Sequence, residues 1–279
     1  HMVLDVALIA ITLIALLIAS YSDIRTREVP DWLNYGLIFA AFGVRIIFSF
    51  ELGWTVLFSG ILGFIICLAL AFLFYYTGQW GGGDSKLLMA MGVIIGINYS
   101  FNADSWNLLF FFLALLFLGA IYGLIYMIVI AIVKRKLFVK DITKRMKKQK
   151  KLHSFTLIVS LIFVVLTIFQ SFFWPLIILP LGMFYLFSFV NSVEKTCFFK
   201  KIKPENLTEG DWLAEDVKVG TKIIVAAKTL EKEDLVKLLP LKNLILIKEG
   251  VPFVPSFLFA YLVLIFGREV FDFIIKRLF

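Results

Sequence analysis

Apolar residues in this sequence gather into long blocks that are separated by short polar segments. The first five blocks occupy residues 3–22, 33–50, 55–76, 86–103 and 107–133. Each block approaches or exceeds the roughly 20 helical residues that are needed to cross the hydrocarbon core of a bilayer. The pattern therefore predicts transmembrane helices throughout residues 1–133.

The later apolar blocks are less regular. Residues 154–190 are too many for one ordinary span, and Trp174 and Pro175 lie in their middle. This block is therefore either a hairpin of two short spans or a kinked, partly interfacial element. A last block, 253–275, is interrupted by charged residues. We expect an all-α polytopic membrane protein with six to eight transmembrane helices.

Composition supports the membrane assignment. Hydrophobic residues make up 61% of the chain and charged residues 17%, whereas a soluble domain is about half apolar and about a quarter charged. Because the chain has only 2 Cys and 2 His, we expect neither a disulfide framework nor a metal site.

The distribution of basic residues predicts an orientation. Residues 134–151 contain ten Lys or Arg and one acid, Asp141, and such a segment stays in the cytoplasm. Counting back through the predicted spans places residues 23–32 and 77–85 on the same side and the N-terminus outside. The expected partner of the basic segment is the anionic lipid of the inner leaflet.

Residues 191–252 differ from the rest because acids, bases and short apolar runs alternate. We expect a small α+β cytoplasmic module here, in which Thr229 caps a short helix. Its near-neutral charge argues against nucleic-acid binding. The expected division of the chain is 1–133 (catalytic membrane helices), 134–153 (basic loop), 154–190 (hairpin or kinked span), 191–252 (module) and 253–279 (C-terminal membrane helix).

Two aspartates lie at predicted helix ends on the cytoplasmic side. Asp23 follows the first apolar block, and Asp84 follows the three glycines 81–83. Either could be an ordinary cap or surface group, but three glycines before an aspartate serve no spanning helix and allow close backbone approach. Two adjacent carboxylates share one proton, so that one activates water and the other protonates a scissile carbonyl.

These residues carry a resemblance to a known family. Gly81-Gly82-Gly83-Asp84 matches the GxGD motif of intramembrane aspartyl proteases. With Asp23 and Pro30-Asp31-Trp32 upstream, the chain resembles the prepilin peptidase branch and, within it, the archaeal preflagellin peptidases. The resemblance implies that Asp23 and Asp84 catalyse cytoplasmic removal of a short basic leader from preflagellin or prepilin-like precursors. The paired CxxC zinc element and the cofactor motif expected of methylating bacterial members are missing, so we expect no cofactor.

Other expectations concern substrate and rival functions. We expect Gly81 and Gly83 to lie along an extended substrate, and Lys86 to bind substrate carbonyls or else to reach the lipid headgroups. A proton- or cation-coupled transporter that uses the same aspartates, or a membrane scaffold, are the alternatives. We also expect the two carboxylates to stay apart without substrate. The oligomeric state and the exact cleavage position are left open.

Overall fold

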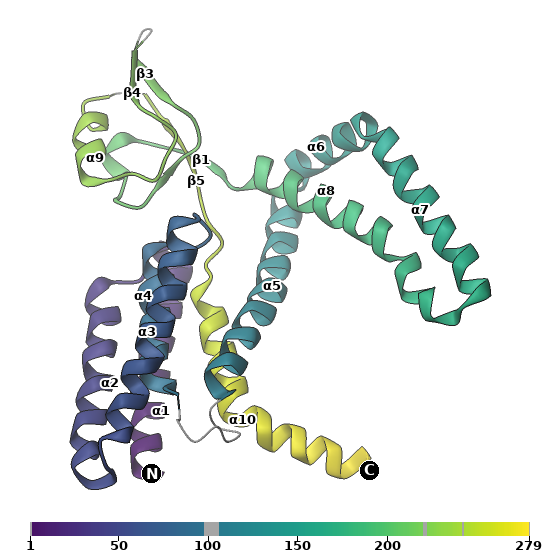
Figure 1. The fold of residues 1–279 in the computed structure, drawn as a ribbon. Helices are drawn as coiled ribbons and strands as arrows, with labels where there is room; N and C mark the ends of the chain where they lie inside the picture. The colour runs from purple at the N-terminus through teal and green to yellow at the C-terminus, as the bar shows by residue number, and fades with distance from the viewer. Residues whose placement is uncertain (1, 98–105, 220–221, 242, 279) are drawn as a thin grey trace. The chain divides into compact units, whose positions relative to one another are not determined.

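The computed structural model describes residues 2–97, 106–219, 222–241 and 243–278. It divides into two compact units, residues 1–123 with 251–279, and residues 124–250. Six of the described helices are long and apolar enough to cross a membrane. The predicted class, a mostly helical membrane protein with a small strand-containing module, is confirmed (Figure 1).

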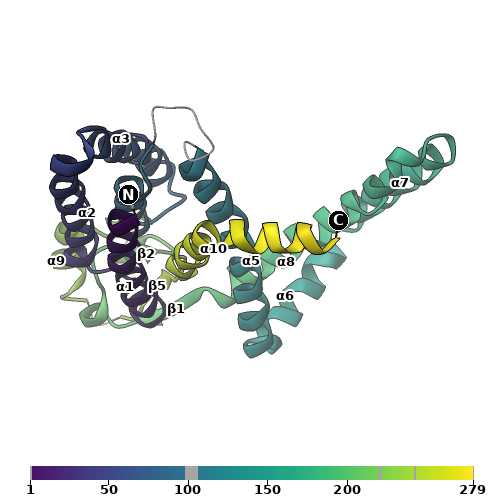
Figure 2. The ribbon, with the colours of Figure 1, turned by 90° about the horizontal axis from the view of Figure 1, so that it is seen from below.

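The first unit is built from helices that pack side by side. Figures 1 and 2 show α1, α2 and α3 as neighbours, with α10 next to α1. Its core is formed by buried leucines, alanines and aromatic residues, among them Leu16, Leu87 and Phe257. Its helices are α1 (Met2–Thr26), α2 (Asp31–Leu52), α3 (Thr55–Tyr76), α4 (Gly82–Ile95), the beginning of α5 (Asn107–Val133) and α10 (Val254–Leu278).

Helix α4 is shorter than the span predicted for residues 86–103. It has 14 residues and ends before Gly96, whose φ of 67° is the left-handed conformation that favours glycine. A helix of this length covers about 21 Å, less than the roughly 30 Å of hydrocarbon in a bilayer. The predicted helix is therefore too long at its C-terminal end; residues 98–103 lie outside the described residues.

Helix α4 is held against α3 by direct backbone contact. A Cβ atom on Gly63 would overlap the carbonyl of Gly92, and one on Gly92 would overlap the carbonyl of Gly63 and the Cβ of Cys67. Small residues of this kind allow membrane helices to approach closely. The glycines therefore determine how near α4 lies to α3.

A buried arginine holds the C-terminal end of α4. Arg45, on α2, is 5% exposed. Its guanidinium donates to the carbonyls of Val93 at 2.6 Å, Ile94 at 2.9 Å and Val56 at 2.7 Å. The last carbonyls of a helix lack hydrogen-bond donors within the helix and carry partial negative charge. A guanidinium there supplies the missing donors and a compensating positive charge. Arg45 thus joins α2, α3 and α4.

The second unit begins in α5 and continues through a helical region. The basic segment after α5, expected as a loop, folds as a helix, and residues 154–190 lie in a hairpin rather than in one kinked span. The elements of this region are α6 (Arg135–Lys148), α7 (Lys150–Phe169), the 3₁₀ helix η2 (Ser171–Ile177), which contains Pro175, and α8 (Leu179–Cys197).

The expected α+β module follows α8. Strands β1, β5 and β2 form one antiparallel sheet with β5 in the centre, and β3 and β4 form a separate hairpin. Its core contains Leu213, Leu230 and Leu238. Its elements are β1 (Phe199–Ile202), η3 (Pro204–Asn206), β2 (Trp212–Leu213), β3 (Val217–Val219), β4 (Lys222–Val225), α9 (Lys232–Leu238) and β5 (Ile245–Lys248).

The cap of the short helix in this module was predicted wrongly. The N-cap of α9 is Glu231, which forms a reciprocal capping box with Asp234. Thr229 lies instead in an isolated β-bridge with Trp212. The bridge extends the chain at Thr229, so the helix begins two residues later than a threonine cap would allow.

Candidate active site

The first predicted carboxylate, Asp23, lies in the last turn of α1. Its side chain is buried, with 6% of the residue exposed, and its Oδ2 accepts a hydrogen bond of 2.9 Å from the backbone N–H of Val254. Helix α1 ends three residues later, where Arg27 has a φ of 64° and the chain turns toward α2. Asp23 is therefore held inside the unit and does not lie in a solvated loop.

Its partner, Val254, is the first residue of α10. The N–H groups in the first turn of a helix have no partner within the helix, and that end of the helix carries partial positive charge. A carboxylate is a favourable neighbour for such an end. Asp23 therefore receives a fixed donor from a segment 231 positions away in the sequence.

The second predicted carboxylate, Asp84, is the third residue of α4. It lies beside the backbone N–H of its own N-cap residue, Gly81, and close enough to Asp23 for the two carboxylates to repel each other electrostatically. The last turn of α1 and the first turn of α4 thus bring both predicted aspartates into one region, as sequence analysis expected.

The first turns of α2 are held on the beginning of α4. The amide nitrogen of Asn34 donates to the carbonyl of Gly83 at 3.4 Å. Lys86 forms an ion pair of 2.5 Å with Asp31 and lies over the ring of Tyr35, 5.3 Å from its centroid. These contacts position Asp84 relative to the chain that follows Asp23.

The glycines of the motif differ in what surrounds them. A Cβ atom on Gly83 would lie 3.3 Å from the Cβ of Val29, which is closer than most real contacts. One on Gly82 would meet only Tyr75, at 3.8 Å, and one on Gly81 would meet Asp84 at the same distance. Val29 therefore lies close to Gly83, and the expected approach of substrate at Gly81 and Gly83 stays a prediction. Gly81 is exposed.

Lys86, for which we expected contact with substrate carbonyls or lipid headgroups, contacts Asp31 and Tyr35, both on α2. The ammonium group thus joins α4 to α2. Its role toward substrate stays a prediction. Binding of substrate carbonyls by Lys86 would require this ion pair to open.

An aromatic cluster covers one side of the same region. Trp80 stacks on Phe74 with 4.6 Å between ring centroids, and it also contacts Phe253 at 5.4 Å and Phe257 at 5.8 Å. Trp80 directly precedes the glycine run and Phe253 directly precedes Val254. The two segments that supply Asp84 and the donor to Asp23 are therefore packed together through apolar rings.

Sequence reasoning did not find Val254 or Asn34 as site residues. Val254 acts through its backbone, so its residue type carries no signal. The nearest indication was the pair of prolines at 252 and 255, which suggests a defined chain path. Asn34 appears as one polar residue in an apolar block, and only the tertiary structure shows that it reaches Gly83.

Among the described residues, no group of three or more His, Cys, Asp or Glu is placed to hold a metal ion. The chemical groups that the site offers are two carboxylates, backbone N–H groups and an apolar wall. Such a site is able to bind an apolar polypeptide segment and to supply one proton donor and one proton acceptor.

Comparison with known proteins finds similarity in the part of the chain that contains Asp23 and Asp84. Residues 10–124 match the model of the Type IV leader peptidase family, and both aspartates lie in this range. The chain is similar to the preflagellin peptidase of Methanococcus voltae, with 38% identity over 97 residues, which are 34% of this chain and 41% of that protein. It is also 38% identical over 87 residues to the preflagellin peptidase of Methanocaldococcus jannaschii, covering 29% of this chain and 35% of that protein.

These matches are partial. The chain spans about two fifths of the length of the curated relatives that it matches. Over residues 10–124, which begin within α1 and end within α5, the predicted resemblance to the prepilin peptidase branch is confirmed. The basic helix and the α+β module lie beyond the matched residues.

Proposed function

We propose, on the premise that residues 10–124 match the type IV leader peptidase family, that this protein is a membrane-embedded aspartyl endopeptidase. Its substrates are preflagellin or type IV prepilin-like precursors, from which it removes a short basic leader. The observation that carries the proposal is that Asp23 and Asp84, 61 positions apart in the sequence, lie near enough in the fold to repel each other electrostatically.

The reaction needs no covalent intermediate. Two carboxylates at short distance hold one proton between them, because both cannot ionise together. The ionised carboxylate takes a proton from water, which attacks the scissile carbonyl, while the protonated carboxylate donates to the carbonyl oxygen. Asp23 and Asp84 are the proposed pair; which of them holds the proton at rest is not assigned.

The fixed contacts of each carboxylate support these roles. Asp23 is oriented by the N–H of Val254, and Asp84 is oriented by the beginning of α4 and by the loop that packs on Gly83. Holding catalytic groups in place before the reaction removes part of the entropic cost of the transition state. The exposed backbone at Gly81 offers a place where an extended substrate segment binds.

The proposed location is the cytoplasmic membrane face. Both aspartates lie at helix ends, and the strongly basic segment 134–151 supports a cytoplasmic side for them by the positive-inside tendency. The proposed N-terminus is outside. A precursor with an apolar helix and a basic leader would reach such a site from within the membrane.

The transporter alternative finds no support among the relatives, which are named as peptidases. A coupling site in a transporter is expected near the middle of the membrane, between discontinuous helices. Here Asp23 lies three residues from the end of α1 and Asp84 lies in the first turn of α4. This arrangement favours a site at one membrane face.

A cleavage assay tests the proposal. Detergent-solubilised protein is incubated with a precursor that carries a basic leader and an apolar helix, and the product is sized by mass spectrometry. Asp23→Asn and Asp84→Asn should each abolish cleavage, and the double variant should be no worse than either single one, because the pair acts as a unit. Glu51→Gln, which changes an exposed carboxylate near the end of α2 that makes no contact with the pair in the described part of the chain, is the control. Substantial cleavage by either single variant would refute the assignment.

A further inference from the structure

Asn34 places an amide side chain inside the apolar core of the first unit. It lies at the beginning of α2, where Leu33, Leu37 and Ile38 are also buried. The residue is fully buried. An amide in such surroundings is unfavourable unless its donors and its acceptor are paired. The hydrogen bonds of this side chain therefore require an explanation.

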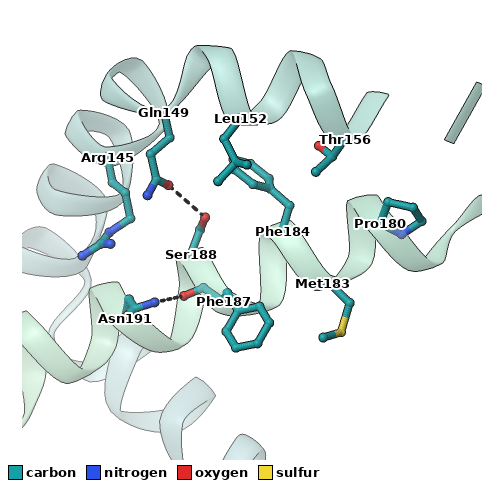
Figure 3. Close-up of a pocket in the computed structure, with 10 residues that line it drawn as sticks. All are labelled: Arg145, Gln149, Leu152, Thr156, Pro180, Met183, Phe184, Phe187, Ser188 and Asn191. Carbon is teal, nitrogen blue, oxygen red and sulfur yellow. Dashed lines mark hydrogen bonds between the residues drawn. The ribbon is translucent and has the colours of Figure 1, made fainter. Parts of the chain in front are cut away.

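An asparagine elsewhere in the chain shows the ordinary arrangement. Asn191, on α8, is exposed, and its amide donates to the carbonyl of Phe187, one turn earlier on the same helix, at 2.8 Å (Figure 3). The amide of Asn34 donates instead to another helix, at the carbonyl of Gly83 on α4, 3.4 Å away and 49 positions later in the sequence. Asn34 thus contacts α4 directly before Asp84.

This contact is not needed to complete α4. Gly83 is the second residue of that helix, and in an α-helix its carbonyl also accepts from the backbone N–H four residues later. A side-chain bond of 3.4 Å adds little to the stability of a carbonyl that already has a partner. Its effect is positional, because it fixes the start of α4 against α2.

The oxygen of the same amide is incompletely bonded. Within the described part of the chain, the Oδ1 of Asn34 is buried and receives no hydrogen bond. A buried acceptor without a donor costs stability, and natural proteins retain such costs mainly at functional sites. Because Asn34 is fully buried, substrate does not reach this oxygen. Its donor must come from a neighbouring helix.

Two buried hydroxyls, those of Ser20 and Ser85, also lack partners among the described residues. Ser85 lies toward α3, because Gly92, seven residues later on the same face of α4, contacts Gly63 of α3. Ser20 lies on α1, which packs beside α2. The hydroxyl of Ser85 is therefore turned away from Asn34, whereas that of Ser20 is a rival donor.

The carboxyl of Asp84 is the donor that the contact at Gly83 favours. Asp84 directly follows the residue to which Asn34 is bonded, and a carboxyl that holds a proton has one O–H to donate. In the proposed reaction the two aspartates share one proton. Asp84 becomes such a donor when that proton resides on it.

We propose, on the premise of the peptidase function above, that Asn34 is a positioning residue for Asp84. Its amide holds the start of α4, and its Oδ1 accepts a hydrogen bond from the Asp84 carboxyl while this carboxyl carries the shared proton. The proton stays on Asp84, and no covalent bond forms or breaks in this step. Asn34 acts on the reaction through Asp84 and not through substrate, and its unpaired oxygen makes the resting fold less stable.

Steady-state kinetics and thermal unfolding of the full chain in detergent test the proposal. In Asn34→Leu, which has a branched apolar side chain, kcat for precursor cleavage should fall by about tenfold, the effect of losing one hydrogen bond to the reacting carboxyl. KM should stay within about twofold, because the lost interaction is not made with substrate. The melting temperature should be unchanged or higher, because a buried acceptor without a donor is removed. Asn34→Ala, which cannot crowd its neighbours, should show the same fall in kcat.

Two control variants separate this role from a general effect of packing. Asn191→Leu makes the same substitution at an exposed position, and Ser20→Ala removes the rival donor; both should keep the wild-type kcat. An equal loss in either control would overturn the proposal, as would a wild-type kcat in either Asn34 variant or a raised KM at unchanged kcat. Failure of the peptidase assignment is distinguishable, because Asp23→Asn or Asp84→Asn would then still cleave the precursor.

Discussion

The backbone N–H of Val254 donates a hydrogen bond of 2.9 Å to the Oδ2 of Asp23, although the two residues stand 231 positions apart in the sequence. This bond ties the end of α1 to the beginning of α10. The C-terminal helix therefore contributes to a site whose two carboxylates both lie in the first third of the chain.

Removal of this donor should reduce activity. In Val254→Pro the N–H is lost, while the first position of a helix tolerates the proline ring. A hydrogen bond to a charged group contributes about 1.5–3 kcal/mol, so kcat for precursor cleavage should fall by roughly tenfold to a hundredfold. Val254→Ala keeps the N–H and shortens the same buried side chain. If both variants lose activity equally, packing rather than the hydrogen bond is responsible.

Within the glycine motif, substitution of Gly83 should reduce activity, whereas substitution of Gly82 should be tolerated. Gly83→Leu would push against Val29 and displace the connection between α1 and α2, so cleavage should fall sharply and thermal stability should fall with it. Gly82→Ala would place its Cβ in ordinary contact with Tyr75, 3.8 Å away, and should retain both. Equal, mild effects at the two positions would mean that the run is only a flexible linker. Melting temperature and cleavage rate, measured on the same samples, give the answer.

Arg45 should be required for stability. Arg45→Met keeps much of the apolar stem but leaves the last carbonyls of α4 without a donor, at a cost of about 2–4 kcal/mol. A lower melting temperature in detergent is the expected result, with Arg45→Lys intermediate because an ammonium cannot reach three carbonyls at once. Arg25→Met is the matched control, since Arg25 is exposed and its guanidinium contacts the side chain of Tyr21, one turn away on the same helix. A melting temperature unchanged by Arg45→Met would contradict this role.

The two carboxylates should stay apart until substrate binds. Each is held by a backbone N–H of a different segment, and like charges resist closer approach. The measurement uses Asp23→Cys with Asp84→Cys in a Cys67→Ala, Cys197→Ser background. A disulfide needs Cα atoms within about 7 Å, so crosslinking should be slow alone and faster with a bound substrate peptide. Rapid, complete crosslinking of the free protein would show a preassembled pair.

Much of this protein is determined by its sequence pattern. Long apolar blocks have few folding solutions other than membrane helices, since backbone polar groups in lipid must be satisfied within the segment. The same pattern located Asp23 and Asp84 at helix ends, and the glycines before Asp84 marked it as unusual. The alternation of charge and short apolar runs after residue 191 likewise indicated the α+β module.

Only the tertiary structure decided how these parts contact one another. Whether Gly83 faces substrate or Val29, whether Lys86 reaches the carboxylates or Asp31, and where α4 ends all depend on contacts between residues distant in sequence. Periodicity reports which face of a helix is apolar, but it carries no information about the neighbour on that face. The role of Arg45 shows this most clearly, because a lone arginine in an apolar block indicates a buried partner, and only the packing of α2 on α3 and α4 supplies the three carbonyls that it binds.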